Sequence, residues 1–162
     1  NCSNNYGPWQ FPEKLIPIAI FNAANNKSIP VYGNGKNVRD WIYVDDHVEA
    51  LIIAFTSSPV GEKYCIGSKV EKSNIDLVKL ICRYMDELRP LGKPYEKLIK
   101  FVEDRPGHDQ RYGIDPSKIM NKLNWKPKYR FEERLLFTVN WYLSNLDWCE
   151  NIKNKTNDKA NS

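Results

Sequence analysis

The chain has few of the features that mark membrane-spanning, disulfide-stabilised or zinc-binding proteins. No apolar run in its 162 residues approaches the ~20 needed to span a bilayer, and no signal-peptide pattern precedes the first structured segment. Its four cysteines are widely spaced and form no C-x-x-C pair, which argues against both a zinc site and a disulfide framework. We therefore expect a soluble, cytoplasmic protein without a metal site or a membrane partner.

The chain also lacks a large excess of charge of one sign. The 24 Lys and Arg residues and the 20 Asp and Glu residues leave a net charge of +4, and the basic residues are scattered along the chain. Because there is no arginine-rich helix and no aromatic-basic repeat, we expect no nucleic-acid partner. What the chain does contain is 41% hydrophobic and 12% aromatic residues, enough to bury one modest core.

Hydrophobic periodicity predicts short strands that alternate with amphipathic helices. We expect strands at 29–32, 41–44, 62–66 and 98–102, and helices at 11–25, 45–58, 73–85, 115–123 and 130–146. Ser73 is suited to cap the third helix, and Asp45 or Asp46 the second. The large apolar residues of the second helix fall on one side, namely Val48, Leu51, Ile52 and Phe55.

This alternation indicates an α/β protein, but the strands are short and the loops between them long. That pattern suits an appended substrate-binding domain better than a complete doubly wound sheet. We expect this domain to span residues 1–150 and residues 151–162, rich in Asn and Lys, to be a disordered tail. Residues 1–8 read as the end of a strand running into a loop, so we expect the chain to be a fragment.

Two polar loops carry groups that suit an anionic, hydroxyl-rich ligand. In the segment 2–8 the carboxamides can donate and accept hydrogen bonds, although a turn rich in Asn and Gly is the alternative. In the segment 37–41, Arg39 stands at the entrance to an apolar strand, where its guanidinium could fork onto a diphosphate. A surface ion pair of Arg39 with a neighbouring acid is equally compatible with the sequence.

Two further segments point the same way. Ser73 and Asn74 open a helix, where backbone amides and the helix dipole favour an anion, although simple capping is the commoner use of such residues. The run 104–112 is denser in polar groups, among them Arg105, His108 and two aspartates around Pro106 and Gly107. A solvated turn does not require so many ionisable groups, but their spacing alone does not name a ligand.

Together these segments resemble the C-terminal half of the dTDP-glucose 4,6-dehydratases, which are extended short-chain dehydrogenase/reductase enzymes. The resemblance covers about residues 1–150. Its most specific pieces are CSNNYGP at 2–8, FPEKLIP at 11–17, VRDW at 38–41 and DRPGHD at 104–109. It implies the substrate-binding part of an NAD(P)-binding Rossmann-like fold, with the end of the Rossmann part at residues 1–8 and the Rossmann core missing.

The resemblance also implies roles for individual residues. Arg39 and Arg105 would clamp the diphosphate of a dTDP-sugar, and Cys2 and Asn5 would lie near the nicotinamide of an NAD cofactor. The other residues implied to line the substrate site are Asn4, Glu13, Lys14, Pro30, Tyr32, Asn74 and His108.

The implied reaction oxidises the sugar at C4 with NAD, eliminates water across C5 and C6, and returns the hydride to C6. The family's Tyr-x-x-x-Lys pair and Thr-Asp-Glu triplet lie upstream, as do the helices of its homodimer, so we expect this fragment alone to be inactive. Tyr32 and Lys36 match the Tyr-x-x-x-Lys spacing, but two glycines between them make the required helix improbable.

Three alternatives stay open from the sequence. The first is another extended-family enzyme, such as an epimerase, a decarboxylase or a GDP-mannose dehydratase, which the run 104–109 disfavours. The second is a non-catalytic module that binds a nucleotide sugar, and the third is an interaction domain in which these motifs are relics.

Overall fold

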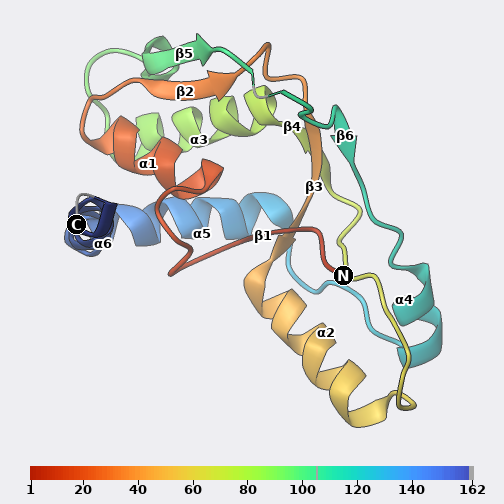
Figure 1. Ribbon diagram of the computed structural model, residues 1–162. Helices are drawn as coiled ribbons and strands as arrows, with labels where there is room; N and C mark the ends of the chain where they lie inside the picture. Colours follow the sequence, from red (N-terminus) through yellow and green to blue (C-terminus); the bar gives the residue numbers. More distant parts are fainter. Residues whose placement is uncertain (105, 161–162) are drawn as a thin grey trace.

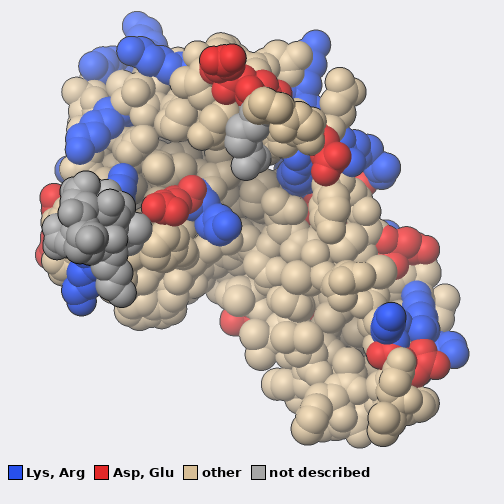
Figure 2. Space-filling view, in the orientation of Figure 1, with Lys and Arg blue, Asp and Glu red and all other residues tan. Residues whose placement is uncertain are grey.

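The computed structural model describes residues 1–104 and 106–160, and side chains as far as residue 155. Figure 1 shows two groups of elements joined by the long strand β3 (Val38–Tyr43), with β1 (Asn4–Tyr6) alongside it. Within the described ranges, no helix is both long and apolar enough to cross a membrane. In Figure 2, acidic and basic side chains lie near one another around the upper part and the right edge of the molecule, while the lower part of this face carries few charges.

The strand β3 pairs with three other strands along its length. Its end runs parallel to β1, with Asn4 opposite Trp41. Its beginning pairs antiparallel with β4 (Glu71–Ser73) and parallel with β6 (Arg111–Tyr112). A separate parallel pair is formed by β2 (Ile29–Tyr32) and β5 (Ile99–Val102). Three segments distant in sequence therefore meet at β3.

All the expected helices are present, with boundaries that differ by a few residues. The described helices are α1 (Leu15–Ala24), α2 (Val44–Ser57), α3 (Asn74–Leu88), α4 (Ser117–Leu123), α5 (Phe131–Ser144), α6 (Leu146–Ala160) and the 3-10 turn η1 (Tyr95–Leu98). The main core lies where α1, α3 and α5 pack on one another, and a smaller core lies between α2 and α4.

Two expectations about helix starts turn out differently. The Ser73 cap is confirmed, because its Oγ accepts a hydrogen bond from the Asp76 amide at 3.2 Å. The expected cap at Asp45 or Asp46 is wrong: α2 begins one residue earlier, at Val44, and has no side-chain cap. Asp46 is buried instead and accepts the Lys128 amide at 2.8 Å, which ties α2 to the segment before α5.

The strand expected at 62–66 is reduced to a single parallel bridge between Cys2 and Ile66. The Ser3 amide donates to the Ile66 carbonyl at 2.9 Å, so residues 1–3 still hold this segment. At the other end, the structure continues α6 through residue 160, where the sequence suggested a disordered tail. In the first half of α6, Cys149 is fully buried against the core and Lys153 lies over the Phe21 ring.

The apolar side of α2 faces outward. Val48, Leu51, Ile52 and Phe55 are all exposed, and Phe55 is 91% exposed. The residues that α2 buries are Asp46 and Ala50. The expected grouping of apolar residues on one side is therefore correct, but in the described part of the chain that side does not belong to the core.

Asp40 is a buried carboxylate that holds the segment leading into β4. Its side chain accepts hydrogen bonds from the amides of Ser68 and Val70 and from the Ser68 hydroxyl, at 3.0–3.2 Å. With 1% of its surface exposed, it has little access to water. Asp40 therefore has a structural role within the VRDW motif.

We predict that Asp40→Ala lowers the free energy of unfolding by about 3 kcal/mol, because two partly buried amides and the Ser68 hydroxyl lose a carboxylate acceptor. Asp45→Ala, at an exposed position five residues along the chain, should change it by less than about 1 kcal/mol. Urea denaturation followed by circular dichroism measures both. Equal effects of the two substitutions would contradict the structural role of Asp40.

Candidate functional site

A cavity of about 370 Å³ opens where α1, β2, β3 and α3 approach one another. This volume lies within the range of small-molecule sites. Its lining contains eight of the residues implied by the resemblance, together with three apolar ones: Asn4, Glu13, Lys14, Leu15, Ile18, Pro30, Tyr32, Arg39, Trp41, Asn74 and His108. The fold thus brings the predicted substrate residues together, while their binding roles stay predictions.

The cavity lies at two helix starts. Lys14 is the N-cap residue of α1, and Asn74 is the first residue of α3, a helix of 15 residues. Amide groups at a helix start favour an anion, and the Lys14 ammonium adds to that preference. The Ser73 hydroxyl serves the helix rather than the cavity, because it binds the Asp76 amide and carboxylate.

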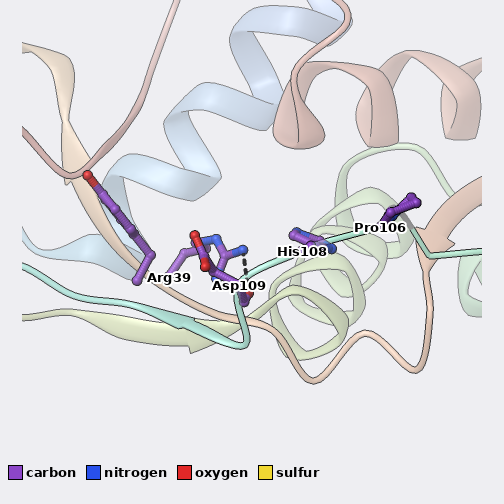
Figure 3. Close-up of a pocket in the computed structure, with 6 residues that line it drawn as sticks. Arg39, Pro106, His108 and Asp109 are labelled. Atoms are coloured by element: carbon purple, nitrogen blue, oxygen red, sulfur yellow. Dashed lines mark hydrogen bonds between the residues drawn. The ribbon is translucent and has the colours of Figure 1, made fainter.

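Arg39 reaches across to the loop that follows β5. Its Nη2 donates to the Asp109 carbonyl at 2.8 Å (Figure 3). Its Nη1 donates to the Val38 carbonyl at 2.7 Å. These partners are backbone carbonyls, so the guanidinium keeps its full positive charge and further N–H groups. Beside it lies a second hollow of about 360 Å³, lined by Arg39, Pro106, Gly107, His108, Asp109 and Tyr112. Arg105, the second predicted arginine, lies outside the described residues.

His108 is held by a carboxylate four residues earlier. Its Nδ1 lies 2.7 Å from Oδ1 of Asp104, and because a carboxylate oxygen accepts, the Nδ1–H group is the donor. The pair packs on the turn at Gly33, where φ is +56° and an added Cβ would lie 2.7 Å from the Asp104 carboxylate. A glycine is therefore required there for both its conformation and its lack of a side chain.

A smaller cavity of about 250 Å³ adjoins the main one and is lined by Asn4, Asn5, Gln10, Lys14, Leu15 and Trp41. Asn5, one of the two predicted cofactor residues, is fixed within the chain. Its amide nitrogen donates to the Ser3 carbonyl at 3.1 Å and to Sγ of Cys2 at 3.5 Å. Its side-chain oxygen accepts from Nδ1 of His47 at 2.8 Å. Asn5 therefore links β1 to α2.

Sequence reasoning missed three residues of this region: Gln10, Trp41 as a lining residue, and His47. Gln10 donates from its side chain to the Asn5 carbonyl at 2.8 Å. His47 follows two acidic residues at the start of α2 and looks like part of a solvated helix turn. No local pattern distinguishes it, because its partner Asn5 lies 42 residues away.

Burial lowers the pKa of His47 below its ordinary value of 6.5, and the positive charge at the amino terminus lowers it further. The neutral imidazole is therefore the form that fits beside Asn5. By contrast, Tyr32 and Lys36 flank a turn with positive φ at Gly33 and Gly35, so the two side chains do not share a helix. The expectation that they form no Tyr-x-x-x-Lys helix pair is confirmed.

The architecture and the cavity define the chain as part of an extended short-chain dehydrogenase/reductase, which confirms the expected fold class. The dTDP-glucose 4,6-dehydratase of Bacillus anthracis, solved with NAD, superimposes with a TM-score of 0.83 at 46% identity. That match covers 93% of this chain and 46% of the other. The UDP-glucose 4-epimerase of Thermotoga maritima, solved with UDP-glucose, has a TM-score of 0.78 at 28% identity and covers 90% and 45%.

The family model of the GDP-mannose 4,6 dehydratases matches residues 1–136, and the chain belongs to this family. Among curated relatives, the dTDP-glucose 4,6-dehydratase of Shigella flexneri is 53% identical over 156 residues. This confirms the resemblance drawn from the sequence motifs. The alignment covers 96% of this chain and 43% of the relative, so the chain spans under half the length of the curated relatives it matches.

We predict that the imidazole of His47 titrates below pH 6.5 in the folded chain. Because the neutral form is favoured in the folded state, stability should be lost as the pH falls from 6.5 towards the lowered pKa. Proton NMR of the His108→Gln variant leaves one histidine to follow, since the chain has two. His47→Gln should remove this part of the pH dependence, and a midpoint at or above 6.5 would contradict the burial of His47.

Proposed function

We propose that this chain forms the dTDP-sugar site of a dTDP-glucose 4,6-dehydratase. The observation that carries the proposal is the shared cavity, in which Lys14, Arg39 and the start of α3 face the same space. Two cations and a helix start suit a diphosphate, which is dianionic. The 53% identity to a dTDP-glucose 4,6-dehydratase supports dTDP over other nucleotides. Because the matching family is that of the GDP-mannose 4,6 dehydratases, a GDP-sugar is the alternative ligand.

The lining residues divide by chemistry into a phosphate end and a base end. Arg39, with Arg105 from the following loop, would clamp the diphosphate, and Asn4 would contact the sugar-diphosphate. Pro30 and Tyr32 offer an apolar and an aromatic surface for the thymine and deoxyribose, while Asn74 and His108 complete the nucleotide pocket. Glu13 and Lys14, which line the cavity just before α1, would lie beside the substrate.

The whole enzyme would convert dTDP-glucose to dTDP-4-keto-6-deoxyglucose and water, and NAD would supply the hydride acceptor. This chain offers Cys2 and Asn5 to the nicotinamide end, and its Gly33-Asn34-Gly35 turn leads from β2 into β3 and not into a helix. A dinucleotide turn leads into a helix. These features support an NAD site formed mainly by polypeptide outside this chain.

We further propose that this chain alone binds its nucleotide without converting it. The family's Thr-Asp-Glu triplet has no match in the 162 residues, and the Tyr32 to Lys36 segment is a turn. The homodimer of the whole enzyme would likewise form through other segments. Incubation of the chain with dTDP-glucose and NAD tests this, and formation of the keto sugar would contradict it.

Arg39→Ala should weaken dTDP binding about tenfold or more, because a charge-assisted hydrogen bond contributes roughly 1.5–3 kcal/mol. The matched control is Arg130→Ala, since Arg130 is an exposed arginine paired with Glu133 at 3.4 Å. The control should change the affinity less than about twofold. Isothermal titration calorimetry of the chain with dTDP measures both. Similar losses in the two variants would argue against Arg39 as a diphosphate ligand.

The same titration distinguishes the nucleotides. We expect dTDP and dTDP-glucose to bind more tightly than GDP and GDP-mannose, because the pocket is proposed to hold thymine. Tighter binding of GDP-mannose would favour the alternative function with a GDP-sugar. If the folded chain bound no nucleotide at all, the motifs would not form a functional site in this chain.

A further inference from the structure

Trp9 stands in a backbone conformation that large side chains avoid. Its φ is +63°, in the left-handed region, and its side chain is 62% exposed. A bulky residue with positive φ is strained, and such strain persists only where surrounding contacts impose it. Trp9 lies in the loop between β1 and α1, one residue before Gln10, which lines the smaller cavity.

The contacts that impose this conformation come from the C-terminal helices. The Trp9 ring packs edge-to-face against two rings. Its centroid lies 4.7 Å from that of Trp141 in α5 and 5.2 Å from that of Trp148 in α6. The rings of Trp141 and Trp148 also pack edge-to-face, with 5.8 Å between their centroids. Edge-to-face aromatic pairs at such distances are favourable beyond the area they bury. Two tryptophans from two helices thus contact this one loop residue.

A hydrogen-bonded path leads from the same helices to the site. The Tyr142 hydroxyl of α5 donates to the Gln10 carbonyl at 2.7 Å, and the Gln10 side chain donates to the Asn5 carbonyl at 2.8 Å. Asn5 and Gln10 both line the smaller cavity. Tyr142 is fully buried, and its hydroxyl also lies 3.4 Å from the Gly7 carbonyl of the same loop, so both of its acceptors belong to that loop.

We propose that Trp141, Tyr142 and Trp148 form a clamp that positions the Trp9–Gln10 loop, and through it one wall of the nucleotide-sugar site. These three are positioning residues, since they act on the ligand through Gln10 and Asn5. The identity of the ligand in this proposal rests on the proposed function, whereas the contacts of the clamp do not. All three follow residue 136, where the match to the family model ends, so that match assigns them no role.

A core contribution alone would not require this arrangement. Trp9 adds little to the core, because most of its surface is exposed, and the loop bears a strained residue that a turn of ordinary conformation would avoid. Strain at a position next to a ligand cavity is the pattern of a loop held for function.

The sharpest test is Tyr142→Phe against Tyr95→Phe. Both tyrosines are buried and donate to a backbone carbonyl, Tyr142 to the loop and Tyr95 to Arg89 at the end of α3 at 2.8 Å. Tyr142→Phe should weaken dTDP-glucose binding about fivefold, and Tyr95→Phe less than about twofold. Calorimetry measures the affinity, and equal effects of the two substitutions would overturn the clamp.

A second readout needs no ligand. Amide hydrogen exchange of residues 5–14 should become faster in Tyr142→Phe and stay unchanged in Tyr95→Phe. If the unmodified chain binds no dTDP-glucose, the proposed function fails while this readout still tests the clamp. Unchanged exchange overturns the clamp, and faster exchange with unchanged affinity overturns its role in the site.

Trp148→Ala and Trp148→Phe test the aromatic contacts. The alanine variant should lose both affinity and exchange protection in the loop, and the phenylalanine variant should restore most of each by returning a ring. Ile119→Ala controls for general destabilisation, because Ile119 is fully buried in the smaller core between α2 and α4. Loss of loop protection in the Ile119 variant equal to that in Trp148→Ala would overturn the clamp.

Discussion

The pairing of β3 is the constraint on which the rest of this structure depends. This six-residue strand pairs with β1 at its end and with β4 and β6 at its beginning. The loops next to those strands therefore lie close to one another around β3. The separate β2–β5 pair then brings in Tyr32 and the run that starts at Asp104. Without these pairings, the polar residues of the cavity would lie on unrelated parts of the surface.

The alternation of side chains along β3 divides its motif between function and structure. Successive residues of a strand point to opposite sides. Arg39 and Trp41 accordingly line the cavity, while Asp40 between them is buried and holds Ser68 and Val70. One four-residue motif therefore supplies both a cation at the cavity and an anchor for the fold.

Much of this arrangement was predictable from local sequence. Helical spacing located α1, α3 and α5, the Ser73 cap formed as expected, and the polar loops contained the residues that line the cavity. Prediction failed where a partner came from far along the chain. Asp46 looked like a helix cap but binds the Lys128 amide, and His47 looked like part of a solvated helix turn but binds Asn5.

The sequence by itself determined the α/β class, the family resemblance and the residue types of the site, because periodicity, capping and motifs are local properties. Only the tertiary structure decided that Arg39 binds the Asp109 carbonyl, that His47 holds Asn5, and that Trp9 is clamped by α5 and α6. These contacts join residues 42 to 139 positions apart, and their geometry is set by strand register and helix packing. No local pattern carries that information.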